Sequence, residues 1–588
     1  MNLKSLLPEW GWIAKYQIKD LKGDLNAGLT VGVIIIPQGM AYAMIAGLPP
    51  IYGLYASTIP LIVYSLWGTS RQLAIGPVAL ISLLTLSGLQ VIAEPGTSEF
   101  IALAILLTFL VGFIQLFFGL LRMGFLVNFL SHPVNTGFIS AAALIIAVGQ
   151  LKHLTGLDIP NTNRMHEILI YLGVHWKEIN LPGLLIGTCS VGIILLANKI
   201  HRTVPGALIA VVISILVTAW LNLPQQNVQI VGEIPRGLPV FSLPDLNWVN
   251  IRSLIPTSLA ITLIGFTGSI AIAKGLEAKH RKYRINSNKE LIAIGLANIG
   301  GALFKSFPVT GGFARTAVND QAGANTGLAG IISALLVILT LLLLTPLFYY
   351  LPNAVLASVI MVAVLGLIDW RAALSLWKTD RMDFWMLLAT FISTLTLGVE
   401  EGIAIGVLLS LIMIIYRSVY PHFAVLGKIP ETQIYRNIDR FKEVEDRDDL
   451  LIIRFDADLY FANINYFIDN INRLAQRKGK ALKAIIIDAE SISYVDSSAL
   501  RGLKEMIDQF KTNEIRVLFS DVKGPVRDRF YKFGFLQEES NSFFLNISDT
   551  VNNIEMESKE PNQEYLKQFR LQSNLKKSKD SGPKHSTS

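Results

Sequence analysis

Two short segments rich in glycine and proline carry the residues best suited to bind a small anion. Residues 71–79 read RQLAIGPVA and residues 307–316 read FPVTGGFART, and they begin the third and the tenth candidate membrane segment. A helix that begins inside a membrane leaves its first N–H groups unpaired and places about half a positive charge there. Two such helix ends facing one another would form a seat for an anion, made mainly of backbone donors.

Arg315 adds a side-chain cation about one turn into the second segment. An arginine at membrane depth costs about 2.5–3.5 kcal/mol on insertion scales, so it normally faces a cavity or a charged partner. We expect Arg315 to face the anion seat. The alternatives are a structural ion pair with Asp320 and a position at the membrane interface.

A third polar feature lies in the first apolar stretch. Pro37 interrupts it and kinks the helix, which frees a backbone carbonyl. Gln38 and Tyr42 follow at a spacing of i and i+4, so they share one helix face. Their amide and phenol groups can donate hydrogen bonds to an anion, or to a neighbouring helix.

The composition indicates that these segments lie in a membrane. Of 588 residues, 52% are hydrophobic and 16% charged, and the mean hydropathy is +0.48. These values exclude a water-soluble enzyme and a disordered chain. A spanning helix needs about 20 mostly apolar residues. About fourteen candidate spans follow: two within 25–70, then 73–93, 100–121, 124–150, 181–198, 204–222, 253–273, 290–304, 307–320, 326–350, 353–368, 384–399 and 402–417.

The distribution of basic residues predicts the orientation. Lysines precede the first span, and Lys and Arg gather in the loops after the eighth and twelfth spans, whereas loops such as 93–99 and 349–353 carry none. The positive-inside rule then places both termini in the cytoplasm, in a multi-pass protein of the cell membrane. Because the basic residues behind the net charge of +7 lie between spans or in the tail, we expect no nucleic-acid partner.

Composition also divides the chain into parts. We expect an amphipathic lead-in over 1–24, a transmembrane anion-transport domain over 25–420, a linker over 421–448 and a disordered tail over 549–588. Residues 449–548 alternate short apolar runs with helical patterns, which is typical of a small α/β domain. The single cysteine, Cys189, excludes an internal disulfide and a zinc site, and we expect no metal and no cofactor.

Several motifs, in order along the chain, resemble the sulfate permease (SulP) family. These are PQGMAYA at 37–43, PIYGLYAS at 50–57 continuing to GTSR at 68–71, and PVTGGFARTAV at 308–318. The resemblance covers roughly residues 20–545. It implies a seven-plus-seven inverted repeat in which a core domain moves against a gate domain, with the substrate between the third and tenth helices. The implied substrate-binding residues are Gln38, Tyr42, Gly76, Pro77, Val78, Ala79, Phe313, Ala314 and Arg315.

Two positions depart from the family pattern. Ala314 stands where the family often has serine, so one hydroxyl contact is absent. Gly268 stands where many members have a glutamate associated with proton coupling. The other carboxylates lie at the edges of apolar spans, as Asp320, Glu400 and Glu401 do. Proton symport is therefore in doubt.

The C-terminal domain resembles a STAS domain, on the motif YVDSSAL at 494–500. In bacterial anti-sigma antagonists, the second serine of this motif is phosphorylated, which makes Ser498 a candidate regulatory phosphosite. Asp496 and Ser497 also form an ordinary helix N-cap, which we favour. The resemblance further implies a homodimer.

These features predict a secondary active transporter of inorganic anions, sulfate first, that works by alternating access in the lipid bilayer. No phosphate-binding run of the type GxxxxGK[ST] is present, so the energy must come from the anion gradient, from exchange, or from a coupled proton or sodium ion. Transport or exchange of bicarbonate or chloride is the alternative. A membrane-anchored STAS signalling protein is a remote one, and an enzyme is not expected.

Overall fold

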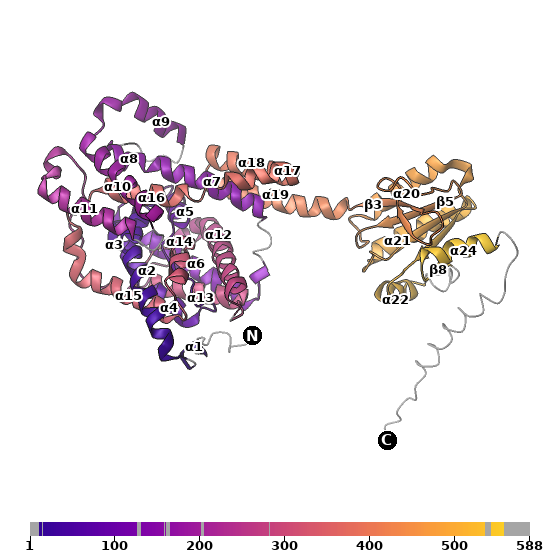
Figure 1. The fold of residues 1–588 in the computed structure, drawn as a ribbon, viewed down its shortest axis with the longest axis horizontal. Coiled ribbons are helices and arrows are strands. Elements are labelled where there is room, and N and C mark those ends of the chain that lie inside the picture. The colour runs from indigo at the N-terminus through magenta and orange to yellow at the C-terminus, as the bar shows by residue number, and fades with distance from the viewer. Residues whose placement is uncertain are drawn as a thin grey trace, which may run out of the picture. The chain divides into compact units, whose positions relative to one another are not determined.

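The computed structural model describes residues 11–14, 16–125, 131–157, 159, 165–200, 205–281, 283–534 and 542–557. The chain divides into two compact units, Met1–Leu411 and Ile412–Ser588 (Figure 1). The predicted lead-in residues 1–10 and 15, and the predicted tail residues 558–588, lie outside the described residues.

The first unit is built from helices and one minimal pair of strands. In chain order they are α1 (Gly11–Ala14), α2 (Ile18–Ile45), α3 (Pro50–Tyr55), α4 (Ile59–Trp67), β1 (Ile75–Gly76), α5 (Ala79–Leu89), α6 (Ser98–Leu120), α7 (His132–Gly149), α8 (Leu151–Thr155), α9 (Met165–Val174), α10 (Leu181–Ile200), α11 (Gly206–Trp220), α12 (Trp248–His280), α13 (Ser287–Ala302), β2 (Thr310–Gly311), α14 (Phe313–Gln321), α15 (Leu328–Leu339), α16 (Asn353–Leu365), α17 (Trp370–Thr379), α18 (Arg381–Thr396) and α19 (Val399–Val419).

Helices overlap every predicted span. Within the described part of the chain, seven helices are long and apolar enough to cross a membrane, and α5, α10 and α11 are shorter apolar helices. The second predicted span is divided into α3 and α4, while α8, α9 and α17 were not predicted as separate helices. The protein is thus a multi-pass membrane protein, although length and composition establish fewer crossings than the fourteen predicted.

The start of the first span differs from the prediction. Helix α2 begins at Ile18, so the end of the expected lead-in is its first two turns. Asp24 lies in this part and is fully buried, where its carboxylate accepts hydrogen bonds from the backbone N–H groups of Asn325 and Thr326 and from the Thr326 hydroxyl. A buried carboxylate is tolerated because these donors replace the water that it loses.

The helix contacts are those of an inverted repeat. Helix α2 packs against α14 and α15, and its counterpart α12 packs against α5 and α6. In the same way α4 packs against α15, and α13 packs against α6. These four contacts between the two halves thus form two equivalent pairs, as the seven-plus-seven arrangement requires.

Glycines let the first helix approach its neighbour closely. A β-carbon on Gly53 would lie 1.9 Å from the carbonyl oxygen of Gly39, so α2 and α3 meet backbone to backbone. No larger residue fits at Gly53 unless the two helices separate. This contact fixes α2, which carries Gln38 and Tyr42.

The second unit contains a six-stranded sheet flanked by helices. Its strands are β3 (Phe423–Lys428), β4 (Tyr435–Asn437), β5 (Leu450–Phe455), β6 (Ala484–Asp488), β7 (Arg516–Ser520) and β8 (Phe543–Phe544), in the spatial order β4-β3-β5-β6-β7-β8. Strands β5 to β8 are parallel, and β3 is antiparallel to both β4 and β5. The helices are α20 (Ile464–Lys478), α21 (Ser497–Thr512), α22 (Gly524–Lys532) and α24 (Ile547–Glu557).

Two of the predicted boundaries in this unit are wrong. The expected linker over 421–448 contains β3 and β4, whose backbone extends the sheet beyond β5. The expected tail begins within α24, whose Val551 and Ile554 are buried against the sheet face opposite α20, α21 and α22. Both segments fold because they cover sheet surface that would otherwise be exposed to water.

Candidate functional site

Two strands of two residues each bring the predicted half-helices together. Strands β1 and β2 pair antiparallel, with Ile75 opposite Gly311 and Gly76 opposite Thr310. Helix α5 begins directly after β1, and α14 directly after β2. The ends of two segments about 240 positions apart in the sequence are therefore held side by side.

Both helix ends keep unpaired backbone donors. Val78 is the N-cap of α5 and Gly312 is the N-cap of α14, and neither has a side chain that accepts a hydrogen bond from the first N–H groups of its helix. The first intrahelical bonds run from Ser82 to Val78 and from Thr316 to Gly312, which leaves the earlier N–H groups of each helix without intrahelical partners. These are the backbone groups that the sequence predicted as donors.

Arg315 is buried beside this strand pair. Its side chain is 2% exposed, and none of its three guanidinium nitrogens has a hydrogen-bond partner. A β-carbon on Gly76 would lie 3.2 Å from Nη2 of Arg315, and one on Gly312 would lie 2.8 Å from the same atom. The guanidinium occupies space that two glycines leave free.

The alternative ion pair with Asp320 is wrong. Asp320 instead pairs with Lys279, at 2.5 Å between Nζ and Oδ2, and with His280. No carboxylate of the described residues forms a salt bridge with Arg315.

The other predicted site residues differ in burial. Tyr42, Gly76, Pro77 and Ala79 are buried, and Gln38 and Val78 are partly buried. Phe313 and Ala314 are exposed, with Phe313 at 69%, although they are the first residues of α14. All nine residues lie on α2, on the segment from β1 to α5, or at the start of α14, and α2 packs against both half-helices.

Helix α12 holds the second strand through residues that the sequence prediction missed. The Ser269 hydroxyl lies 2.7 Å from the Thr310 hydroxyl and accepts a hydrogen bond of 2.9 Å from the backbone N–H of Gly311. Thr310 donates to the carbonyl of Gly265 on the same helix. The hydroxyl of Ser269 within a mostly apolar helix is the feature of the sequence from which this contact could have been predicted.

Further polar residues fix the segments before each half-helix. Asn298 of α13 both donates to and accepts from the backbone of Val309, at 3.1 and 2.9 Å. The Thr316 hydroxyl accepts from the N–H of Ala74, and Asn319 donates to the carbonyl of Gln72. The site is thus held by side chains from α13 and α14.

Position 268 opens into free space. Gly268 is partly buried on α12, next to Ser269, and a β-carbon there would have no atom within 4 Å. A larger side chain would therefore fit at this position. The missing glutamate is not explained by crowding.

One buried carboxylate was overlooked by the sequence prediction. Glu290, at the start of α13, is 1% exposed and accepts hydrogen bonds from the Tyr64 hydroxyl, the Thr69 N–H and hydroxyl, and the Ser70 N–H. These partners come from α4 and the loop that leads to β1. Glu290 therefore ties α13 to the segment that precedes the first half-helix.

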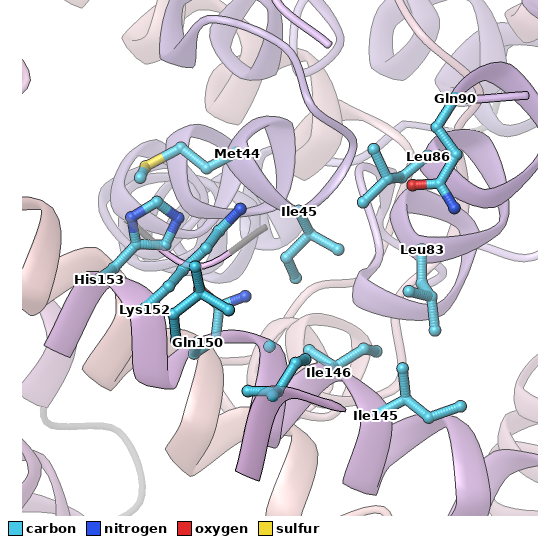
Figure 2. Close-up of a pocket in the computed structure, with 13 residues that line it drawn as sticks. Met44, Ile45, Leu83, Leu86, Gln90, Ile145, Ile146, Gln150, Lys152 and His153 are labelled. Atoms are coloured by element: carbon cyan, nitrogen blue, oxygen red, sulfur yellow. The ribbon is translucent and has the colours of Figure 1, made fainter. Parts of the chain in front are cut away.

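A small cavity of about 60 Å³ lies at the opposite end of α5 (Figure 2). Met44 and Ile45 of α2, Leu83 and Leu86 of α5, and residues of α7 and α8 line it. Gln150 and His153 add polar groups, and the side-chain amide oxygen Oε1 of Gln150 is buried without a partner. The cavity has room for a few water molecules and none of the nine predicted site residues lines it.

In the second unit, Asp496 is the N-cap of α21. Its carboxylate accepts from the N–H of Ala499 at 2.8 Å and from the N–H of Phe461 at 2.8 Å. Ser498 is exposed in the first turn. The predicted capping role is confirmed, and the phosphosite stays a prediction. Over the described residues, no group of three or more His, Cys, Asp or Glu side chains could hold a metal ion.

Comparisons with known proteins match both units. Residues 21–390 match the sulfate permease family, and residues 441–553 match the STAS domain. The chain is 37% identical over 568 residues to "Sulfate transporter 4.1, chloroplastic" of Arabidopsis thaliana, an alignment that covers 93% of this chain and 82% of the relative.

Solved structures share the fold. The structure of the murine Solute Carrier 26 family member A9 anion transporter in the inward-facing state is similar, with a TM-score of 0.86 and 27% identity, covering 93% of this chain and 94% of that one. The transmembrane domain of a cyanobacterium bicarbonate transporter, BicA, is similar with a TM-score of 0.58 and 25% identity, covering 67% of this chain and 97% of that one.

Proposed function

Because this chain belongs to the sulfate permease family, we propose that it is a secondary active transporter of inorganic anions, with sulfate as its first substrate. The anion binds where α5 and α14 begin, in contact with the groups predicted from the sequence. The relative from Arabidopsis thaliana is named a sulfate transporter, which favours sulfate over other anions.

The observation that carries this proposal is the unpaired guanidinium of Arg315. A buried cation without a partner costs several kcal/mol in a protein interior. Arg315 is 2% exposed and none of its three nitrogens is hydrogen bonded, so the protein bears this cost unless an anion completes the site. The adjacent helix ends add positive potential of the same sign, because α5 and α14 both direct their N-termini to this point.

Binding proceeds through exchange of water for protein donors. The anion leaves its hydration shell and accepts hydrogen bonds from the first N–H groups of α5 and α14 and from Arg315. Gln38 and Tyr42 donate from α2. The negative charge of the anion offsets the positive charge of Arg315 and of the two helix ends. The occupied site therefore has less uncompensated charge than the empty site, and moving it through the apolar interior costs less free energy.

Alternating access then requires that the site moves as one body. Strands β1 and β2 join the two half-helices, and α2 and α12 each pack against both of them. Helices α7 and α18, and α10 and α16, pack against each other in a second group, which meets the first group where α16 contacts α2 and α7 contacts α5. We infer that the first group shifts against the second and exposes the anion on alternate sides of the membrane.

Bicarbonate or chloride is the second candidate substrate. A seat made mainly of backbone N–H groups does not select strongly between tetrahedral, planar and monoatomic anions. Gly268 supplies no proton-binding group, which favours exchange or another coupled ion such as sodium over proton symport. The likeness to a bicarbonate transporter at 25% identity supports the same alternative.

The finer features of the protein remain part of this proposal. We place it in the cell membrane with both termini in the cytoplasm, as a homodimer in which the STAS domain contributes to assembly. Protease digestion of right-side-out and of inside-out vesicles tests the orientation, because only in inside-out vesicles are cytoplasmic termini accessible to the added protease. Cross-linking in the membrane tests the dimer.

Uptake of labelled sulfate into proteoliposomes tests the proposed function. We expect saturable uptake by the wild-type protein, with unlabelled chloride and bicarbonate as competitors. Arg315→Ala removes the only side-chain cation of the proposed site, and we expect the rate to fall at least about tenfold, because charge-assisted hydrogen bonds are lost.

Lys274→Ala is the matched control. Lys274 is an exposed cation on α12, so its removal changes the net charge equally without touching the site. Unchanged uptake by a folded Arg315→Ala protein would contradict the assigned site. Absence of sulfate uptake together with uptake of labelled bicarbonate or chloride would retain the site and overturn the substrate.

A further inference from the structure

Besides the small cavity near Gln150, the protein has a larger one that is lined by basic residues and contains none of the nine proposed transport-site residues. It has a volume of about 420 Å³. It is lined by Ser65 of α4, the loop from α4 to β1, the loop from α12 to α13, the start of α13, Gly327 and Trp12. No lining residue belongs to α5, α14 or the helices of the second contact group. A ligand here would lie outside the path between the two groups of helices.

Three cations face this cavity from different segments. Arg71 comes from the first loop, Arg284 from the second, and Lys289 from α13. The carboxylate of Glu290 is near, but its hydrogen bonds to Tyr64, Thr69 and Ser70 occupy it. Even without Lys289, the two arginines Arg71 and Arg284 carry more positive charge than Glu290 carries negative charge.

Hydrogen-bond donors accompany the charge. The indole N–H of Trp12 is buried in the cavity wall and has no partner, although indole N–H groups usually find one. Arg71 lies with its guanidinium 5.4 Å from the ring centre of Tyr283, which orients the guanidinium without pairing its charge. Helix α13 begins at Ser287 and adds the positive end of its dipole.

We propose that this cavity binds a phosphate monoester group. Arginine side chains match the geometry of phosphate oxygens, and a volume of this size holds the phosphate together with part of the molecule that carries it. The group belongs either to a lipid headgroup or to a soluble metabolite. Arg71, which binds the phosphate, directly precedes Gln72 in the segment that leads to β1. Gln72 accepts a hydrogen bond from the Tyr283 hydroxyl and donates one to the Ala324 carbonyl, so the ligand contacts a segment that is fixed by hydrogen bonds.

Two arms of one experiment separate the sources. The full chain in phosphatidylcholine nanodiscs is titrated with glycerol 3-phosphate, the soluble form of the simplest phosphate headgroup. In the second arm, native mass spectrometry counts phosphatidic acid retained from mixed nanodiscs. Binding in the first arm alone identifies a soluble ligand, and binding in the second arm alone identifies a lipid.

Arg284→Gln is the test variant and Arg281→Gln its control. Both residues are exposed cations in the same region, but Arg281 does not line the cavity. We expect binding to weaken about tenfold in Arg284→Gln and to stay unchanged in Arg281→Gln. Arg71→Lys keeps the charge without the guanidinium fork, and we expect an intermediate loss.

Three results would overturn the proposal. These are the absence of binding in both arms, an equal loss in Arg284→Gln and Arg281→Gln, and a loss in Arg315→Ala without one in Arg284→Gln. The last result would place the phosphate in the proposed transport site instead. Because the readout is binding, it does not depend on whether sulfate is transported.

Discussion

The guanidinium of Arg315 lies against Gly76, at the place that a larger residue's side chain would occupy. A β-carbon on Gly76 would be 3.2 Å from Nη2 of Arg315 and 3.1 Å from Cδ1 of Ile35. Gly76 stands in β1, opposite Thr310 of β2, so the contact links the first half-helix segment to a side chain of the second. The guanidinium of Arg315 thus occupies space that is free because residue 76 has no β-carbon.

Gly76→Ala should therefore impair transport without unfolding the protein. The added methyl group forces the guanidinium to move by a few tenths of an ångström, and the φ of 159° at Gly76 adds backbone strain for any residue with a β-carbon. Overpacking of this kind costs about 1–3 kcal/mol. We expect the rate of labelled anion uptake to fall about tenfold. Gly275→Ala on α12, where a β-carbon meets nothing within 4 Å, is the control. Equal rates in both variants would contradict the contact.

The sequence predicted the two half-helices because their signal is local. Glycine and proline at the start of an apolar run mark a helix that begins there, and β1 with α5 and β2 with α14 begin at those residues. Their pairing follows from the repeat, since each segment is third in its half. The sequence favoured Arg315 facing the half-helices but left an ion pair with Asp320 open, because the partners of Asp320, Lys279 and His280, belong to a different helix.

Elements whose burial depends on distant partners were missed for a physical reason. Glu290 looks like a residue at the edge of a span, and its burial is compensated by Tyr64, Thr69 and Ser70, more than 200 positions earlier. Helix α24 has few apolar residues, so its sequence resembles a solvated tail. Only the sheet face that Val551 and Ile554 cover makes it fold.

Ser269→Ala should loosen β2. The variant loses the hydroxyl that bonds Thr310 and accepts from the N–H of Gly311, and it leaves a buried donor unpaired. We expect a loss of about 1–3 kcal/mol in stability and slower uptake. Ser253→Ala is the control, since that hydroxyl is exposed and bonds only the Val249 carbonyl of its own helix. Thermal unfolding and uptake are measured together, and a change equal to that of the control would refute the role of Ser269.

Asp496→Ala should destabilise the second unit, whereas Ser498→Ala should not. The carboxylate of Asp496 accepts from Ala499 and from Phe461, and loss of an N-cap costs about 1 kcal/mol. Ser498 is exposed, so its removal breaks no buried contact. Hydrogen exchange at the start of α21 measures the difference in the full chain. Comparable protection in the two variants would mean that Asp496 does not act as the cap.

Asp521 should make the second unit less stable as the pH rises. Burial, together with the carboxylates of Asp488, Glu490 and Asp549, raises the pKa of Asp521 to about 6. The unfolded chain has the lower, ordinary pKa, so the folded state binds the proton more tightly. The penalty is absent below the unfolded pKa and grows until the pH passes about 6.

Asp521→Asn removes this penalty. Asparagine tolerates the left-handed backbone at this position, where φ is 57°, as aspartate does. We expect slower hydrogen exchange in β7 of the variant than of the wild type near pH 7.5, by at most about 1 kcal/mol because the group is partly exposed. The difference should vanish toward pH 4. A difference that is independent of pH would show that the charge of Asp521 is not its cause.

Gly268→Glu should add a dependence on protons that the wild-type protein lacks. The side chain fits, because a β-carbon at position 268 has no atom within 4 Å, and it places a carboxylate on α12 next to Ser269. Such a group takes up and releases a proton, which glycine cannot do. We expect uptake of labelled sulfate by the variant to rise with an inward proton gradient, and uptake by the wild type to be unaffected. Gly268→Gln has the same size without a titratable group and should behave as the wild type does. Stimulation of the wild-type protein by the gradient would show that another group couples the proton, and a response of Gly268→Gln equal to that of Gly268→Glu would show that side-chain volume causes the effect.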